Sequence, residues 1–386
     1  MPHRASVVIV GGGVIGASIA FHLAEAGVRD VVLLERGALG SGSTCKAAGG
    51  VRAQFSDELN VLIGARSLDA YARFGERTGQ EIGLRRVGHL FLLSEPDHVA
   101  AFTRGVALQN ALGVESRLVD PAEARRLSPL ITTEGLLAAV HSPHDGHCTP
   151  QSVVLGYAGA ARRLGARLYT GVTVQDLELR GDEVRTVVTD RGRVTTDTVV
   201  CAAGAWAGAV GAMAGVDLPV PPLRRQMLCT GPMRSLRELS EPLPFTVDFG
   251  TSFSFHQEGP GLLIGMSDPM QEPGFDTSYS PHWLPRLGAA LARRAPALLD
   301  VGLGGGWAGL YEMSPDGNAV LGRSVTPANF VYATGFSGHG FLQAPAVGEI
   351  VRDLCLGRAP FVDVGPLHAG RFAPGAAAPR PESHVV

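Results

Sequence analysis

A glycine-rich turn near the N-terminus constrains the fold more than any other feature of this sequence. Residues 7–10 are four consecutive β-branched residues, which is typical of a strand buried on both faces. The G-x-G-x-x-G pattern of residues 11–16 follows, then apolar residues at helical spacing, then a second apolar run at 31–34 that ends in Glu35. Such glycines permit close approach of a pyrophosphate to a helix N-terminus, and the carboxylate can bind a ribose diol. The sequence therefore predicts a βαβ unit that binds a dinucleotide.

The composition is typical of a compact α/β enzyme with two domains. The chain has 386 residues, of which 45% are hydrophobic, and its 51 glycines and 26 prolines supply many turns. The formal net charge is -3 and the charged residues are scattered singly. Nothing in this pattern favours a nucleic acid or an anionic membrane surface as partner. We expect the partner to be a small molecule.

The cysteines favour a reducing, cytoplasmic setting. There are five, an odd number, widely separated and without a C-x-x-C pair. A signal peptide is the alternative, because residues 5–24 carry no charge and the sequence AEA at 24–26 resembles a cleavage site. The consecutive glycines at 11–13 would break the apolar helix that a signal peptide or a membrane span needs, so we favour the nucleotide turn. We expect residues 371–386 to form a flexible tail.

Helical spacing, caps and alternation predict further elements along the chain. Three helices are expected: residues 57 to about 77, a short helix with Pro121 in its first turn, and residues 150 to about 164. Their candidate N-caps are Ser56, Asp120 and Thr149. Strands are expected at 88–93, in a meander over 166–202, and within 223–265.

A second glycine-rich loop, GFSGHGF at 335–341, lies between a predicted strand and a helix that we expect to begin near Ala344. Such a loop directs backbone N–H groups and a helix dipole at one point, which suits negative charge on a bound ring. A plain strand-to-helix turn is the alternative. Together with the first turn, the loop favours a cofactor between the two.

The segment TCKAAGGVRAQF at 44–55 has five small residues between Lys46 and Arg52. Small residues let a flat ligand lie against the backbone. The arginine suggests an anion nearby, because its planar guanidinium donates two parallel hydrogen bonds to a carboxylate.

The ordered motifs resemble those of the D-amino-acid oxidase superfamily of FAD enzymes. They are VVIVGGGVIGASIAFHLAEAG, LLERG, GSTCKAAGGVRAQF, DG near 145, VVCAAGAWA, GGWAGLYEMSPD and FVYATGFSGHGFLQAPAVGE. Within the superfamily, the chain is similar to the branch that holds sarcosine oxidases, dimethylglycine dehydrogenases and the β subunit of archaeal-type proline dehydrogenase. The resemblance covers roughly residues 5 to 360.

The resemblance implies an α/β fold in which a Rossmann-like FAD-binding domain carries an inserted α+β substrate domain on a mixed, largely antiparallel sheet. The FAD-binding domain is expected at 1–85, 145–218 and 310–370, and the substrate domain at 86–144 and 219–309.

The resemblance also implies which residues contact FAD. These are Gly11, Gly13, Val14, Ile15, Gly16, Glu35, Arg36, Ser43, Thr44, Lys46, Ala47, Ala48, Gly49, Gly50, Val174, Ala203, Gly204, Trp206, Gly309, Gly335, Gly338, His339, Gly340, Phe341 and Leu342. Arg52 matches the family arginine that binds the substrate carboxylate, and Tyr311 matches an active-site tyrosine. His256 and His339 are candidate acid or base groups, and the family motif around His339 implies that its main role is contact with the flavin. Phe253 covers the site or belongs to the core.

The activity implied is FAD-dependent oxidation of the CH–NH bond of a small amino acid or N-substituted glycine. Sarcosine, proline or a D-amino acid is the expected type of substrate. Hydride transfer to flavin N5 gives an imine, and oxygen or an electron carrier takes the electrons. The chain acts alone or within a homo- or hetero-oligomer.

Departures from the family pattern refine this expectation. Lys46 stands where dimethylglycine dehydrogenases have a flavin-linked histidine, and Gly309 where monomeric sarcosine oxidases have a flavin-linked cysteine, so we expect noncovalent FAD. Leu263 and Leu342 replace two lysines that promote reaction with oxygen, which slightly favours a dehydrogenase over an oxidase.

Several alternatives remain beside this interpretation. The HSPHDGHC segment at 141–148 resembles a zinc site, but we expect exposed loop histidines and no metal. An NAD-dependent dehydrogenase would share the first βαβ unit without needing the second glycine loop. A non-catalytic FAD-binding assembly factor is disfavoured because Arg52 and Tyr311 are retained. We expect Arg224 and Arg225 to be solvated at the surface, with the entrance of the substrate domain as the alternative location.

Overall fold

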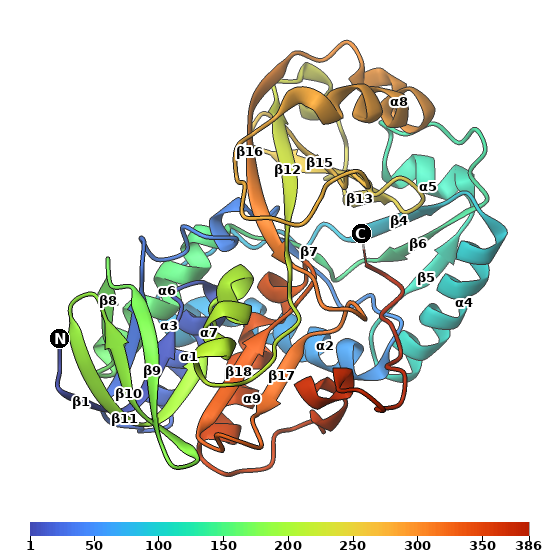
Figure 1. Cartoon of the computed structure of the whole chain (residues 1–386). Helices are drawn as coiled ribbons and strands as arrows, with labels where there is room; N and C mark the ends of the chain where they lie inside the picture. The colour runs from blue at the N-terminus through green and yellow to red at the C-terminus, as the bar shows by residue number, and fades with distance from the viewer. Residues whose placement is uncertain (386) are drawn as a thin grey trace.

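Two eight-stranded sheets organise the chain in the computed structural model, which describes residues 1–385 (Figure 1). The first has the strand order β17-β18-β11-β1-β2-β8, with β10 and β9 extending from β11. Its strands are β1 (Arg4–Val10), β2 (Val31–Glu35), β8 (Arg167–Thr170), β9 (Val174–Arg180), β10 (Glu183–Thr189), β11 (Gly192–Cys201), β17 (Val320–Arg323) and β18 (Phe330–Thr334). Strands β8, β2, β1, β11 and β18 are mutually parallel.

Strand β1 is buried on both faces, and its alternate residues belong to different cores. Val7 and Ile9 pack in the core that includes α1 (Val14–Glu25), α6 (Pro150–Arg163) and α9 (Gly340–Cys355). Val8 and Val10 pack in a second core with α7 (Ala207–Met213) and the β9–β10–β11 meander. This explains why the N-terminal strand reads as a continuous β-branched run.

The second sheet has the order β16-β12-β15-β14-β13-β4-β6-β5 and is antiparallel except for the β13–β4 pair. Its strands are β4 (His89–Leu93), β5 (Arg117–Val119), β6 (Ala138–Ser142), β12 (Pro222–Thr230), β13 (Phe245–Asp248), β14 (Phe253–Glu258), β15 (Gly261–Met266) and β16 (Leu303–Glu312). Helices α4 (Pro96–Ala111), α5 (Pro121–Leu127) and α8 (Leu284–Arg294) lie on this side of the molecule (Figure 1). The predicted α/β fold with a mixed, largely antiparallel second sheet is confirmed.

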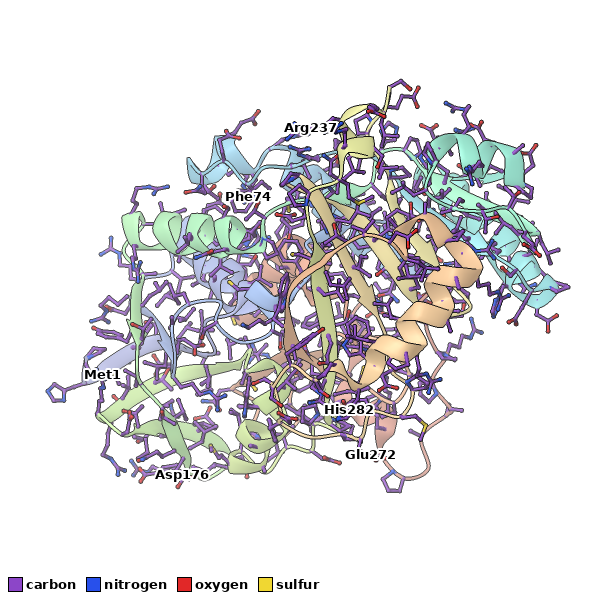
Figure 2. All side chains as sticks on the ribbon, turned by 90° about the horizontal axis from the view of Figure 1, so that it is seen from above. Met1, Phe74, Asp176, Arg237, Glu272 and His282 are labelled. Atoms are coloured by element: carbon purple, nitrogen blue, oxygen red, sulfur yellow. The ribbon has the colours of Figure 1, made fainter. Side chains whose placement is uncertain are left out.

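The strands fall within the segments expected for the two domains, except that β16 crosses the boundary at 309/310. Seen from above, Met1 and Asp176 lie on the side of the first sheet, whereas Glu272 and His282 lie toward the second (Figure 2). A third, two-stranded sheet pairs β3 (Gly50–Val51) with β7 (Gly146–His147). No helix within residues 1–385 has the length and apolar character needed to cross a membrane.

The helix after Arg52 begins and ends differently from the prediction. Asp57, not Ser56, is the N-cap of α2 (Glu58–Ala72), since its carboxylate accepts from the N–H groups of Leu59 and Asn60. The helix ends at Ala72, and α3 (Phe74–Thr78) follows as a separate element. At α6, Thr149 occupies the N-cap position without a side-chain hydrogen bond. Asp120 caps α5 as expected.

The last helix, α9, begins at Gly340 rather than near Ala344. Pro345 lies inside it and has no N–H to donate to the carbonyl of Phe341. The hydroxyl of Tyr71 donates to that carbonyl instead, at 2.5 Å. A proline therefore fits the first turns of this helix without leaving a buried carbonyl unpaired.

Residues near the C-terminus pack against the rest of the chain, which differs from the flexible tail expected for 371–386. Glu382 and His384 are buried. The His384 ring stacks on Phe102 of α4 with a centroid distance of 3.8 Å. Figure 1 shows this red segment leaving the side of the first sheet and ending beside the second.

Candidate active site

A cavity of about 840 Å³ is lined by residues of both sheets. Its walls include the first glycine turn, the small-residue segment before Arg52, strands β12 and β16, and the loop before α9. Its volume is within the range of cofactor and ligand sites.

The first glycine turn fits a pyrophosphate because side chains are excluded from it. Gly11 has φ +111°, and a Cβ there would lie 2.2 Å from the carbonyl oxygen of Ala202. A Cβ on Gly16 would lie 1.9 Å from the carbonyl oxygen of Gly11, so helix and turn are in direct backbone contact. Helix α1 begins at Val14 with its N-terminus at the cavity. This arrangement matches the dinucleotide turn predicted from the sequence.

Glu35 is fixed at the end of β2 by two backbone donors. Its Oε2 accepts from Gly12 N and its Oε1 from Gly37 N, each at 2.7 Å. Each carboxylate oxygen keeps a second lone pair for a ribose hydroxyl. Beside it, the guanidinium of Arg36 lies 3.7 Å above the ring of Trp206, which also lines the cavity.

The small-residue segment is fixed against neighbouring backbone. Gly49 has φ +76°, and a Cβ there would lie 2.1 Å from the carbonyl oxygen of Cys148. Gly50 pairs with His147 in the two-stranded sheet. On the other side, Trp307 Nε1 donates to the carbonyl of Lys46 at 3.0 Å. Residues 47–50 therefore present backbone and small side chains to the cavity.

The second glycine loop meets strand β16 at the same cavity. Gly338 has φ +100°, and a Cβ there would lie 2.6 Å from Cε2 of Tyr311. A Cβ on Gly309 would lie 2.6 Å from Cβ of Lys46. The two glycine-rich segments, far apart in sequence, thus line one cavity, and the residues present fit an elongated flavin nucleotide.

His339 lies in this loop at the N-terminus of α9 and is buried. Burial, together with the nearby Arg52 guanidinium, lowers its pKa to about 3. Its Nε2 has no hydrogen-bond partner within residues 1–385. The imidazole is therefore neutral at physiological pH and cannot act as a protonated acid.

Arg52 lines the cavity but donates its hydrogen bonds to backbone carbonyls. Its Nη1 donates to Gln54 O, and its Nη2 donates to His384 O at 2.8 Å. The guanidinium lies 4.4 Å from the ring centroid of Phe55. Arg52 does not face bulk water, and each terminal nitrogen donates one of its two N–H groups to the protein backbone.

Arg225 and Tyr311 lie together in the cavity wall. The Arg225 guanidinium is 5.3 Å from the Tyr311 ring centroid. The sequence interpretation placed Arg225 at the solvated surface, and the structure corrects it. Glu312 also lines the cavity, and burial raises its pKa to about 7. The sequence analysis gave Glu312 no role, and it placed Arg225 near the substrate only as the less favoured alternative.

Most predicted site residues line the cavity, with four exceptions: Gly16, Gly335, Phe253 and His256. Gly16 and Gly335 lie behind the wall, where they permit close packing. Phe253 is 1% exposed and packs with Phe255 in the core of the second sheet. Its neighbours Ser252 and Ser254 line the cavity instead, because successive side chains of a strand point to opposite faces. The alternation of phenylalanine and polar residues at 252–255 was the available signal.

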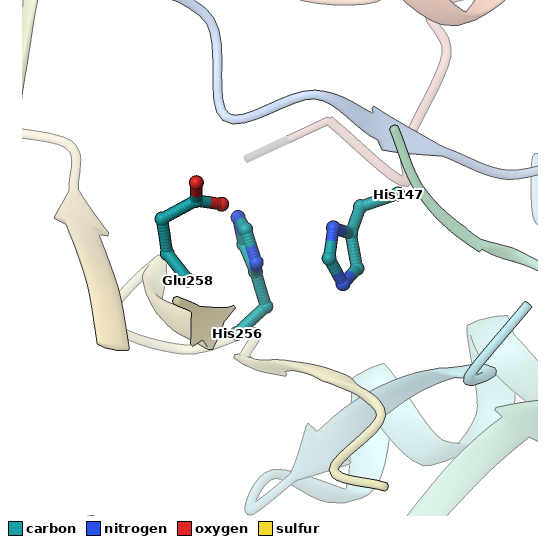
Figure 3. Close-up of side chains that lie close together, drawn as sticks. All are labelled: His147, His256 and Glu258. Atoms are coloured by element: carbon teal, nitrogen blue, oxygen red, sulfur yellow. The ribbon is translucent and has the colours of Figure 1, made fainter. Parts of the chain in front are cut away.

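The histidines of the 141–148 segment do not come together. His144 pairs with Glu115, and His141 lies beside Arg117. His147 lies instead near His256 and Glu258, with possible ligand atoms within 4.8 Å of one another, and His256 is between the other two (Figure 3). Both nitrogens of His256 already face carbonyl oxygens, those of Gln257 and Ala48, at 3.0 Å. A metal ion would have to displace one of these contacts.

Comparison with known proteins supports the geometry. A family model described as FAD dependent oxidoreductase (DAO) matches residues 6–354. Mitochondrial dimethylglycine dehydrogenase of Mus musculus is 33% identical over 387 residues, covering 96% of this chain and 44% of the relative. Glycine oxidase of Geobacillus kaustophilus (strain HTA426) is 30% identical, covering 96% and 98%. The crystal structure of L-proline dehydrogenase from P. horikoshii has a TM-score of 0.90 at 32% identity, covering 97% and 100%. The chain spans less than half the length of the dimethylglycine dehydrogenases that it matches.

Proposed function

Because the chain belongs to the DAO family of FAD-dependent oxidoreductases, we propose that it oxidises the CH–NH bond of a small amino acid or N-substituted glycine. The observation that carries this proposal is the shared cavity, in which the dinucleotide turn, the second glycine loop and a cationic wall meet. A hydride leaves the carbon next to nitrogen, the nitrogen lone pair forms a C=N bond, and the resulting iminium ion becomes an imine when its N–H proton passes to solvent. Bound FAD supplies the two-electron acceptor.

The chain's own residues hold the reactants. The turn at Gly11 and Gly13 and the carboxylate of Glu35 bind the nucleotide, and residues 47–50 support the flat ring. Tyr311 stays a neutral phenol, because burial raises its pKa, so its hydroxyl can donate to a substrate oxygen. His339 is neutral at physiological pH, so it adds no charge to the cavity wall beside the substrate amine. Orientation and exclusion of water are the contributions of this wall.

We propose that FAD is held noncovalently. The two positions at which relatives carry a flavin link are occupied by Lys46 and Gly309. They are adjacent in the structure and both line the cavity. Neither side chain supplies the histidine nitrogen or cysteine sulfur of those links. FAD is therefore expected in the supernatant after acid precipitation of the protein.

A dehydrogenase remains slightly favoured over an oxidase. Leu342 lines the cavity where a lysine would promote reaction with oxygen. Leu263 does not line it, so the argument depends on Leu342 alone. Oxygen or an electron carrier as acceptor, a cytoplasmic location, and an oligomeric partner remain predictions.

The test is anaerobic addition of sarcosine, L-proline, D-proline, glycine and D-alanine to the FAD-loaded protein. Loss of flavin absorbance with one of them, and an imine or its hydrolysis product in stoichiometric amount, is expected. A yellow protein that no member of this panel or of a wider amine panel reduces would favour a non-catalytic FAD-binding factor. A protein that binds NAD and no flavin would be the NAD-dependent alternative.

A further inference from the structure

Two neighbouring arginines on β12 have opposite surroundings. Arg224 donates from Nη1 to Asp276 at 2.5 Å and from Nε to Gln271 at 2.8 Å. Its charge is therefore matched by a carboxylate outside the cavity. Arg225, one residue further along the strand, points to the other face and lines the cavity.

Arg225 differs from Arg224 in its partners. Within residues 1–385 no carboxylate forms an ion pair with it, and the only hydrogen bond that its side chain donates is from Nη1 to the carbonyl of Arg224, at 3.3 Å. Its Nε is buried and has no hydrogen-bond partner in the described chain. Burial lowers the pKa of this guanidinium, which reflects the cost of keeping the charge there.

An unmatched guanidinium in a cavity wall indicates an anion that arrives with a ligand. Burying a charge without a partner is costly, and a carboxylate meets it with charge-assisted, often two-pronged hydrogen bonds. The nucleotide phosphates have their own site in the turn at residues 11–16. Arg225 belongs to a different wall, on β12 opposite Gly309 and beside Tyr311.

Arg52, the arginine expected from the sequence, also lines the cavity but is held by the protein backbone. Both its terminal nitrogens donate to backbone carbonyls, one of them in the C-terminal segment. These bonds use two of the five N–H donors of the Arg52 guanidinium. Arg225 uses one of its five, so more of its donors are left for a ligand.

We propose that Arg225 binds the carboxylate of the substrate, with the Tyr311 hydroxyl as a second donor. This inference rests on the proposed function and assigns its specificity for carboxylate-bearing amines to a residue on β12. Arg225 acts through binding, so its loss weakens recognition of the carboxylate more than it changes the bound FAD.

The experiment uses ligands that cannot be oxidised at nitrogen. Methoxyacetate has the shape of sarcosine with oxygen in place of the N–H group, and methoxyacetamide is its uncharged counterpart. Each is titrated into the FAD-loaded protein, and Kd is read from the change in flavin absorbance. The wild type should bind methoxyacetate about 10- to 100-fold more tightly than methoxyacetamide, as charge-assisted hydrogen bonds predict. Arg225→Gln should reduce this ratio to about one.

Controls separate this effect from a disturbed fold. Arg224→Gln changes a neighbouring arginine outside the cavity and should keep the wild-type ratio. Arg225→Lys keeps the charge without the planar fork, and should retain FAD and give an intermediate ratio, which tests the assignment if Arg225→Gln loses FAD.

The assignment is overturned if the wild type shows no preference for the carboxylate, or if Arg225→Gln keeps the wild-type ratio. If Arg225→Gln does not bind FAD, a wild-type ratio in Arg225→Lys overturns it instead. If Arg52→Gln lowers the ratio of the two Kd values to about one while Arg225→Gln keeps it, Arg52 is the residue that binds the carboxylate. The titration needs no turnover, so failure of every amine to reduce the flavin would reject the proposed function without affecting this readout.

Discussion

Burial, more than charge pairing, controls the ionisation of the side chains around the cavity. It lowers the pKa of His339 to about 3, and it raises the pKa of Glu312 to about 7 and that of Tyr311. These groups are therefore mostly uncharged near neutral pH or close to their titration point. With these neighbouring groups mostly uncharged, the guanidinium charges of Arg225 and Arg52 set the field that an incoming anion meets in this part of the cavity.

Asp145 gives a pH-dependent test of this principle. Its Oδ1 accepts from Ala53 N at 3.1 Å, whereas its Oδ2 is buried without a partner within residues 1–385. Burial raises its pKa from 3.8 to about 7, although the Ala53 N–H and the Arg52 charge act in the opposite direction. The folded protein thus retains a proton that the unfolded chain releases above about pH 4.

We predict that the wild type becomes less stable against unfolding as pH rises, and that Asp145→Asn does not show this decrease. The contribution of the protonated carboxyl is complete below its unfolded pKa of 3.8 and is lost as pH increases through about 7. The melting temperature of the wild type, relative to Asp145→Asn, should fall from about pH 5 to about pH 8. Calorimetry at several pH values measures this. Asp182→Asn, at an exposed turn, is the control, and a constant difference between wild type and Asp145→Asn would contradict the prediction.

At the scale of the element, the sequence was most informative where chemistry is local. The turn at residues 11–16, the cap of α5 and the meander before Cys201 each depend on a few adjacent residues, and each forms as predicted. The start of α9 was misjudged because the carbonyl that Pro345 leaves free is satisfied by Tyr71, about 270 residues away in sequence. The roles of Phe253 and Arg225 depended on which face of the second sheet meets the cavity. The alternation at 252–255 separates the two faces of β14, but it does not say which face meets the cavity.

The first glycine turn yields a prediction about cofactor binding without loss of fold. Gly13 has φ −74°, and a Cβ there would meet only Thr44 Oγ1, at 3.2 Å. Gly13→Ala should therefore fold, but its methyl group enters the wall that faces the nucleotide. We expect FAD affinity to fall about 10-fold or more, as loss of one backbone–anion hydrogen bond predicts.

Fluorescence titration of the apoprotein with FAD measures that change. Gly288→Ala is the matched control, because its added Cβ in α8 meets open space, and it should leave FAD affinity unchanged. Wild-type affinity in Gly13→Ala would argue that the nucleotide does not approach this turn.

At the scale of the whole molecule, the cavity depends on two sheets with separate cores. The first sheet supplies the nucleotide turn, and the second supplies β12 and β16 with Arg225 and Tyr311. The resemblance to a known family made this division predictable. It did not predict the C-terminal segment, whose small residues and prolines are typical of a flexible chain.

Glu382 explains why that segment is ordered. Its Oε1 accepts from Ser56 N, Ser56 Oγ and His384 N, at 2.9, 2.6 and 2.9 Å, and its Oε2 accepts from Asn60 Nδ2 at 3.1 Å. These partners surround the start of α2, next to the segment that carries Arg52. The bonds hold the His384 carbonyl where it accepts from Arg52, so the segment connects both halves of the molecule beside the cavity.

We predict that Glu382→Ala releases this segment while leaving the two sheets intact. The carboxylate accepts four hydrogen bonds, and their loss should cost about 2 kcal/mol locally, since bonds to a charged acceptor contribute about 1.5–3 kcal/mol. Hydrogen exchange followed by mass spectrometry should show the hydrogen-bonded amides of residues 382–384 protected in the wild type and about 10-fold or more faster in the variant, because opening becomes less costly. Glu238→Ala, at an exposed position, should exchange like the wild type. Rapid exchange of this segment in the wild type itself would mean that its contacts do not hold it, and Arg52 would then be free to meet a ligand.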